Sequence, residues 1–156
     1  MLSSLQPFYE WCGNTALGMW IRDTVWAFPL IETFHLLALA VLLGSVLIIN
    51  LRILGCGARF ASASQLAGDL EPWIRVSIVV GIFSGVLLFM SEPMKCYESY
   101  SFPVKMGLIV AGVVFHFTGE RKWALGAQGF RSKLAAGVAL VLWTGVGLAG
   151  KGIPYI

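Results

Sequence analysis

Hydrophobic residues occur in long runs along this chain, and charged residues gather between the runs. The clearest run lies between Glu32 and Arg52, where 19 residues carry no charge and most are Leu, Val, Ile or Ala. At about 1.5 Å per residue, a helix of this length crosses the roughly 30 Å hydrocarbon core of a bilayer. The pattern therefore predicts a membrane-spanning helix over about residues 28–51.

Three further apolar runs follow, over about residues 73–90, 104–119 and 134–150. The connection before the second run is rich in Gly, Ala and Ser, and Pro72 suits the first position of the helix that follows it. No internal repeat or second domain is visible. We therefore expect an all-α protein in which residues 1–156 form a single transmembrane domain, an integral membrane four-helix bundle.

The first 24 residues differ from the spans because they are rich in aromatic residues and also carry charged residues. Trp11, Trp20 and Tyr9 are of the residue types that favour the boundary between membrane and water. We expect an N-terminal amphipathic interfacial segment, a short helix on the membrane surface that leads into the first span. An alternative is a lid over a site at that surface. The N-terminus lacks the basic start and continuous apolar run of a signal peptide.

Composition supports a membrane protein and excludes other classes. Hydrophobic residues make up 58% of the chain and charged residues 12%, about half the charge of a soluble domain. The net charge is +3, but the sequence contains no basic stripe of the kind that binds nucleic acid. Membrane lipid is therefore an expected partner, and nucleic acid is not.

The distribution of basic residues predicts the orientation. Seven basic residues lie in or beside the connections after the first and third spans, and four lie on the other side. Because Lys and Arg are retained in the cytoplasm, both termini should face outward. The seven are Arg52, Arg59, Arg75, Arg121, Lys122, Arg131 and Lys133, and the four are Arg22, Lys95, Lys105 and Lys151.

Both histidines of the chain, His35 and His116, lie in predicted spans. An ionisable side chain is expensive there and normally faces the protein interior. One interpretation is a hydrogen bond from His35 to a neighbouring helix, with Glu32 at the level of the headgroups. The other is that each histidine binds a metal, and that the metal is the iron of a haem. Glu32, one turn before His35, would then accept the second ring N–H and fix the tautomer.

The third span places several notable residues on one helical stripe: Lys105, Ile109, Gly112, His116 and Glu120. Lys105 and His116 point the same way, roughly 16 Å apart along the axis. Gly112 would leave room for a flat ligand beside His116, and Lys105 would reach a haem propionate or extend to lipid headgroups. His35 and His116 have different predicted depths, so one shared haem, two separate sites, or Lys105 or a methionine as the partner of His35 all stay open.

Glycines supply a further candidate surface. Gly81 and Gly85, four residues apart in the second span, form a small face that fits either a neighbouring helix or a flat cofactor. Glycines also recur along the third and fourth spans. They are more numerous than one small bundle needs for its own packing, which predicts a homo-oligomer.

Three cysteines are present, and no two of them form a C-x-x-C motif. In the predicted topology Cys12 and Cys96 lie outside, where they could form a disulfide, and Cys56 lies inside. Met90, Met94, Cys96 and Met106, with the histidines, are soft ligands that would also suit copper.

The third span with its flanks, FPVKMGLIVAGVVFHFTGERKW, resembles the corresponding helix of the HemJ-type protoporphyrinogen oxidases and the CopD-like membrane proteins. Those proteins carry a lysine at the helix start, a histidine eleven residues later and basic residues after it. The first span, with His35 early and LRILG at its end, resembles their first helix. The resemblance covers about a third of the chain. It implies a bacterial four-helix membrane protein in which His35 binds haem b and Lys105 is functionally important.

The leading hypothesis is thus a b-type haem protein of the bacterial inner membrane. It would transfer electrons between a quinol and an acceptor, or to a small oxidant. A protoporphyrinogen-oxidase-like enzyme and a copper-handling membrane protein are alternatives, and a structural subunit without a cofactor is a fourth. Whether the chain is an enzyme, as a membrane oxidoreductase would be, stays open at this point.

Overall fold

The computed structural model describes residues 5–57, 60–119 and 129–152. Four helices in these residues are long and apolar enough to cross a membrane. They are α3 (Ala27–Leu54), α4 (Ala63–Ser91), α6 (Ser101–Phe115), which a π-helical turn extends over 116–119, and α7 (Phe130–Gly152). Each contains or nearly contains one of the predicted spans, and the prediction of an all-α membrane bundle is confirmed.

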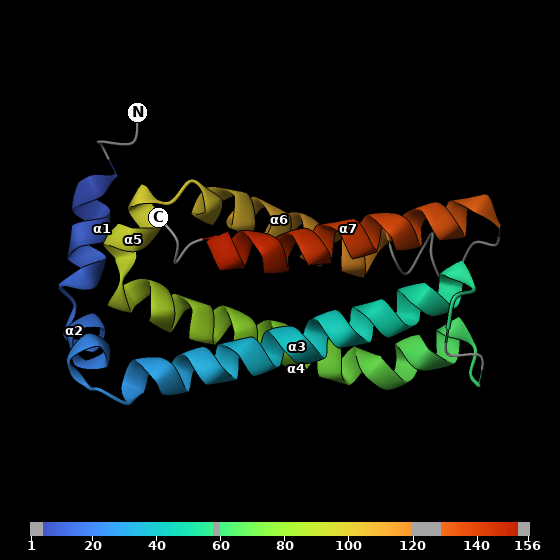
Figure 1. The fold of residues 1–156 in the computed structure, drawn as a ribbon, viewed down its shortest axis with the longest axis horizontal. Coiled ribbons are helices and arrows are strands. Elements are labelled where there is room, and N and C mark those ends of the chain that lie inside the picture. The colour runs from blue at the N-terminus through green and yellow to red at the C-terminus, as the bar shows by residue number, and fades with distance from the viewer. Residues whose placement is uncertain (1–4, 58–59, 120–128, 153–156) are drawn as a thin grey trace.

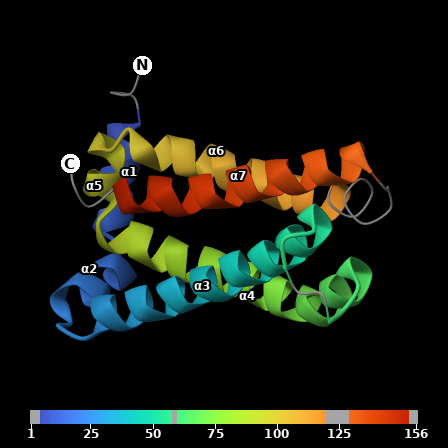
Figure 2. The same cartoon turned by 45° about the vertical axis from the view of Figure 1, so that its right-hand side comes forward.

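The four long helices form two antiparallel pairs, α3 with α4 and α6 with α7 (Figures 1 and 2). The pairs join chiefly where α3 packs along α7. The core therefore lies among α3, α4 and α7. Its fully buried members are Leu42, Val46, Ile49, Leu66, Ile74, Trp143 and Val146.

The turn between α3 and α4 follows from local sequence signals. Gly55 ends α3 in the left-handed conformation, with φ 85°, which glycine adopts without steric cost. The Arg52 Nε–H donates to the Ala61 carbonyl at 2.7 Å and ties the turn to the helix end. Ser62 then begins α4 with a capping box, in which its side chain accepts from Gln65 N–H and the Gln65 side chain accepts from Ser62 N–H.

This capping box corrects the predicted start of the second span. The helix begins at Ala63, ten residues before the predicted start at 73, and Pro72 lies inside it instead of at its first position. Proline removes one backbone hydrogen bond from the helix. The helix continues through it because Leu66, before the proline, and Ile74, after it, both pack into the core.

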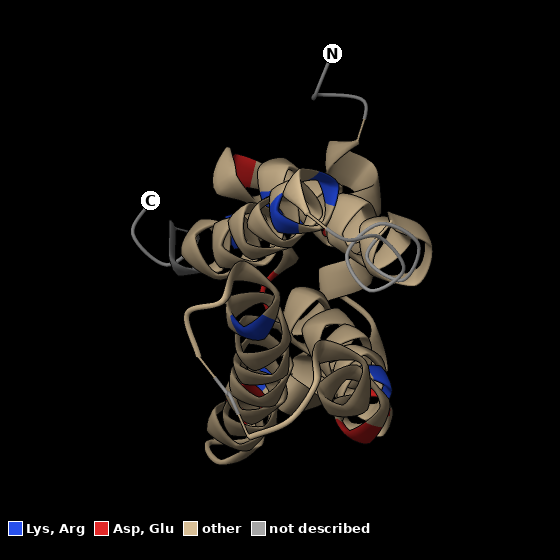
Figure 3. Cartoon of the chain, turned by 90° about the vertical axis from the view of Figure 1, so that its right-hand side faces the viewer, with Lys and Arg blue, Asp and Glu red and all other residues tan. Residues whose placement is uncertain are grey.

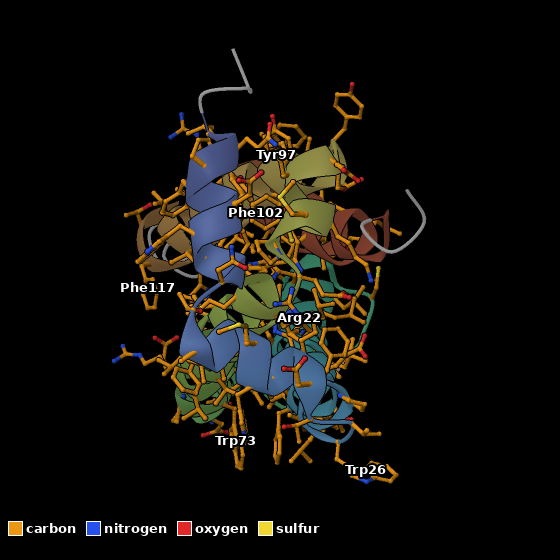
Figure 4. The ribbon with its side chains drawn as sticks, turned by 90° about the vertical axis from the view of Figure 1, so that its left-hand side faces the viewer. Arg22, Trp26, Trp73, Tyr97, Phe102 and Phe117 are labelled. Atoms are coloured by element: carbon orange, nitrogen blue, oxygen red, sulfur yellow. The ribbon has the colours of Figure 1, made fainter. Side chains whose placement is uncertain are left out.

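Three short helices cover one end of the bundle: α1 (Gln6–Gly13), α2 (Ala16–Asp23) and α5 (Pro93–Glu98). Figure 1 shows α1 running across the direction of the long helices. The predicted N-terminal surface segment is therefore two helices, divided where Thr15 caps α2 through Gly18 N–H. Trp11, Trp20 and Trp26 are mostly exposed, and Figure 4, which looks onto this end, shows Trp26 directed away from the bundle.

Charged residues separate between the two ends. Arg52, Arg131 and Lys133 lie near the ends of α3 and α7 that are farthest from α1 and α2, and Arg75 lies near the middle of α4. Figure 3 views the molecule from that side and shows basic segments on helix ends near the viewer. Arg22 and Lys95 lie in α2 and α5 at the opposite end. Arg59, Arg121, Lys122 and Glu120 are outside the described residues.

The docking of α2 on α4 generates a first prediction. A Cβ on the buried Gly18 would collide with the backbone carbonyl of Met90 at the end of α4. We expect Gly18→Ala to destabilise the protein by about 1–3 kcal/mol, as overpacking does, and to lower the melting temperature in detergent. The matched control is Gly107→Ala in α6, where a Cβ meets nothing within 4 Å. An unchanged melting temperature for Gly18→Ala would contradict the close approach.

Candidate functional site around His35

His35 lies two turns into α3, half-buried against α4. Its Nδ1 is 2.9 Å from Ser84 Oγ, and Ser84 Oγ is itself 2.6 Å from the Val80 carbonyl of its own helix. A hydroxyl has one hydrogen, and the carbonyl can only accept. The Ser84 hydrogen therefore goes to Val80, and His35 Nδ1–H donates to Ser84. This tautomer leaves the lone pair on His35 Nε2.

Two glycines of α4 shape the surface under the imidazole. A Cβ on Gly85 would lie 3.3 Å from His35 Cε1, so glycine is what allows the ring to approach the helix this closely. One turn earlier, a Cβ on Gly81 would meet nothing within 4 Å, and the Gly81 carbonyl lies close to the His35 ring. The predicted glycine pair thus has two roles. Gly85 provides the contact between the helices, and Gly81 leaves open surface beside the histidine.

Lys105 of α6 lies at the same end of the bundle. Its Nζ would be 3.3 Å from a Cβ on Gly150, so the side chain lies along α7, and it is only partly exposed. The ammonium is close enough to interact electrostatically with His35 and with Cys96 of α5. The sequence placed Lys105 on one stripe with His116, but the tertiary structure brings it near His35.

The predicted partner of His35 needs correction. Glu32 is exposed on α3, and within the described part of the chain its carboxylate has no hydrogen bond. The His35 N–H that it was expected to accept goes to Ser84 on the neighbouring helix. Sequence reasoning missed Ser84, although a serine between Gly81 and Gly85 in an apolar span is a signal of a polar contact between helices.

His116 lies in a different polar cluster. Its buried imidazole Nε2 is 3.3 Å from Glu71 Oε2 of α4, and Glu71 Oε1 accepts from Arg75 Nε at 2.8 Å. Because His116 begins the π-helical turn, it lies where the helix is locally widened, a feature often found at specialised sites. Arg75 also lies over the Phe117 ring. These contacts join α6 to the first turns of α4.

The two histidines do not share a site. His35 contacts Ser84 and His116 contacts Glu71, thirteen residues apart on the same helix. That separation is about 20 Å at 1.5 Å per residue. Two nitrogens that bind one metal ion at about 2 Å each lie within about 4 Å of each other. One haem held by both imidazoles is therefore incompatible with this fold.

The space predicted beside Gly112 is filled. Gly112 is buried, and a Cβ on it would lie 3.3 Å from Cε2 of Trp143. The glycine accommodates the indole of α7, so no flat ligand fits between Gly112 and the neighbouring helix. This packing holds α6 against α7 midway along both helices.

The end of the bundle near His35 is covered by aromatic contacts. Tyr9 of α1 packs against Phe89 of α4 and Tyr97 of α5, with ring centroids 5.4 and 5.3 Å apart. Phe89 in turn stacks on Phe102 of α6 at 5.5 Å. Figure 4 shows Tyr97 and Phe102 beside α1 at this end. α1 and α5 thus cap the helix ends next to the site.

The cysteines and methionines do not form the predicted arrangements. Cys12 and Cys96 both lie at the end with α1 and α5, as expected, but both are free thiols, so the predicted disulfide is absent. Among the described residues, no group of three or more His, Cys, Asp or Glu side chains could hold a metal ion. Copper handling therefore gains no support from such a group.

Comparison with known proteins gives one match. A family model described as "Family of unknown function (DUF6644)" matches residues 8–156. The chain belongs to the DUF6644 family. No curated protein and no solved structure matches it. Nothing in these comparisons connects the DUF6644 protein to the HemJ-type or CopD-like proteins that its first and third spans resemble.

Cys96 provides a test of the geometry at this end. Burial raises the pKa of its thiol from the ordinary 9.0 to about 11, although the Lys105 ammonium opposes the shift. Since only the thiolate reacts, a pKa near 11 leaves about a thousandth of Cys96 reactive at pH 8. In a variant lacking the other two cysteines, we expect the rate of iodoacetamide alkylation to keep rising up to about pH 11. A plateau near pH 9 would contradict this burial.

Proposed function

We propose that this DUF6644 protein binds haem b through His35 Nε2 and transfers electrons between a quinol and an acceptor, or to a small oxidant. The observation that carries the proposal is the pair of hydrogen bonds from His35 Nδ1–H to Ser84 and from Ser84 to Val80. An imidazole that ligates haem iron is typically oriented in this way, by a hydrogen bond from its other nitrogen.

The surroundings of His35 fit a haem better than those of His116. The surface beside His35 at Gly81 is open, and the Lys105 ammonium nearby can pair with a propionate carboxylate. Beside His116, in contrast, Trp143 fills the space at Gly112, and His116 Nε2 faces the Glu71 carboxylate. We therefore restrict the proposed iron ligand to His35 and give His116 a structural role.

Each residue of the proposed site has a defined role. Ser84 holds the proton on His35 Nδ1 and keeps the ring against α4, and Gly85 permits that approach. Lys105 supplies positive charge inside the bundle. The haem would supply reversible one-electron chemistry, and the helices around it would limit the access of water.

A porphyrin-oxidising enzyme is the second candidate. The approach of Lys105 to His35 favours it, because a partly exposed ammonium beside a tetrapyrrole site would also bind the carboxylates of a porphyrinogen substrate. Oxidation of protoporphyrinogen by the purified protein would support this candidate, and its absence in a haem-loaded protein would favour electron transfer alone. Copper handling and homo-oligomer formation stay predictions.

The ligand assignment predicts different results for the two histidines. We expect His35→Ala to lose haem and His116→Gln to retain it, measured by the haem-to-protein ratio after purification from haem-replete cells. Ser84→Ala should weaken haem binding about 10- to 100-fold, because the imidazole loses its orienting partner. Melting curves in detergent serve as the folding control. Full haem content in folded His35→Ala would end the proposal.

We further propose a bacterial inner membrane location with both termini outward. Its basis is the excess of basic residues at the end where α3 meets α4 and where α7 begins. Cys56, which is exposed just after α3, reports on this end. In a Cys12→Ser, Cys96→Ser variant, a membrane-impermeant maleimide should label inverted vesicles and not intact spheroplasts. Labelling of intact spheroplasts would reverse the orientation.

A further inference from the structure

The contact between α4 and α6 differs from the other helix contacts of the bundle. α4 packs along α3 and α6 packs along α7, and within the described residues the backbones of α4 and α6 hardly approach each other. Side chains join the two helices instead. Phe89 stacks on Phe102 at the end covered by α1 and α5, and His116 contacts Glu71 toward the opposite end. The position of the C-terminal turn of α6 therefore depends on a few side chains.

This C-terminal turn also has an unusual geometry, because His116 begins a π-helical turn there. Such turns are rare in proteins and are found frequently at functional sites. The His116 imidazole, which is 4% exposed, lies against Glu71. The next side chain, Phe117, places the centroid of its ring 5.9 Å from the Arg75 guanidinium. The π-helical turn thus directs two successive side chains onto one turn of α4.

The charges around His116 make its imidazole the group that titrates. The Glu71 carboxylate uses both oxygens: Oε1 accepts from Arg75 Nε at 2.8 Å, and Oε2 lies 3.3 Å from His116 Nε2. The guanidinium is always protonated and favours the ionised carboxylate, whereas an imidazole changes its charge near neutral pH. Arg131 and Lys133 of α7 are exposed, and among the described residues neither forms an ion pair with Glu71.

The depth of this cluster allows proton exchange with water. Between Arg75 and Glu92, α4 carries no charge, so this stretch, whose midpoint is close to Ser84, occupies the hydrocarbon core. Glu71 lies about 20 Å before that midpoint at 1.5 Å per residue, and the core extends about 15 Å to each side. The carboxylate is therefore near the membrane boundary, and the Arg75 side chain beside it is 56% exposed.

We propose that His116 and Glu71 form a pH-dependent clamp between α6 and α4. In the protonated state, His116 Nε2–H donates a charge-assisted hydrogen bond to Glu71 Oε2 and holds the C-terminal turn of α6 on α4. When the imidazole releases its proton to water, the ion pair is lost and Glu71 keeps Arg75 as its partner, so the turn is held less tightly. The clamp does not depend on the function proposed for His35, which contacts α4 about 20 Å away.

Melting temperatures of the purified protein in nanodiscs test the clamp. The ion pair stabilises the protein at pH 5.5 and is lost as the pH rises, so the wild type should melt above His116→Gln by about 2–4 °C more at pH 5.5 than at pH 8.5. Glu71→Gln, which removes the charge and keeps the shape, should show the same pH dependence as His116→Gln. Asp69→Asn is the matched control and should show that of the wild type, because Asp69 is an exposed carboxylate of the same helix without an ion pair in the described part of the chain.

Spin labels measure the movement itself. In a chain whose three cysteines are replaced by Ser, one label is attached at Thr118→Cys in the last turn of α6 and the other at Gly68→Cys in α4. Both positions are exposed, and a Cβ on Gly68 meets nothing within 4 Å. Pulsed EPR should give a narrow distance distribution at pH 5.5 and a longer, broader one at pH 8.5. With His116→Gln added, the broader distribution should be present at both pH values.

Two results would overturn the proposal. One is a melting difference between the wild type and folded His116→Gln that is equal at both pH values, because it would identify a contact that does not depend on a proton. The other is a distance distribution in the labelled protein that does not change with pH. The second measurement needs no substitution at His116, so the proposal stays testable if His116→Gln is unstable.

Discussion

The contact of His35 with Ser84 and Gly85 fixes how α3 and α4 approach each other at the capped end of the bundle. Lipid tails are as apolar as the helix surfaces, so burial of apolar area drives helix association in a membrane only weakly. Close approach of backbones and hydrogen bonds between helices take over that role. His35 and Ser84 supply the hydrogen bond, Gly85 supplies the close approach, and together they set the tautomer that leaves Nε2 with its lone pair.

The second polar contact of the bundle, between His116 and Glu71, obeys the same constraint at the opposite end. Placing an ionisable group at the centre of a bilayer is costly, and the cost falls toward the headgroups. Glu71 lies in the third turn of α4. Its carboxylate forms an ion pair with the guanidinium of Arg75, whose side chain is more than half exposed. The indole of Trp143 against Gly112 lies in the middle of the bundle, between the end with the proposed cofactor site and the end where His116 contacts Glu71.

The short helices α1, α2 and α5 cover the end of the bundle near His35. α1 reaches the bundle through Tyr9, whose ring contacts both α4 and α5, and α2 approaches α4 closely at Gly18. Tryptophans on the outer sides of α1 and α2 remain exposed, where they suit the headgroup region. A surface segment that is anchored in lipid and packed on the helix ends restricts how water and solutes can approach His35.

The hydrophobic pattern by itself determined the four spans, the segment across one end and the separation of basic residues, because span length and charge placement are set by the bilayer and are visible locally. It also identified His35 and Lys105 as candidate functional residues, because an ionisable side chain in an apolar span is costly unless it has a partner or a function. Only the tertiary structure decided their partners. Helical spacing predicted Glu32 as the hydrogen-bond partner of His35, but the partner in the structure is Ser84, 49 residues away from His35. The sequence predicted open space beside Gly112, and in the structure the indole of Trp143 fills that space. Helical periodicity defines which residues of one helix share a face, but it does not define which face of a distant helix lies opposite. For this reason only the packed helices show that His116 contacts Glu71 and lies apart from His35.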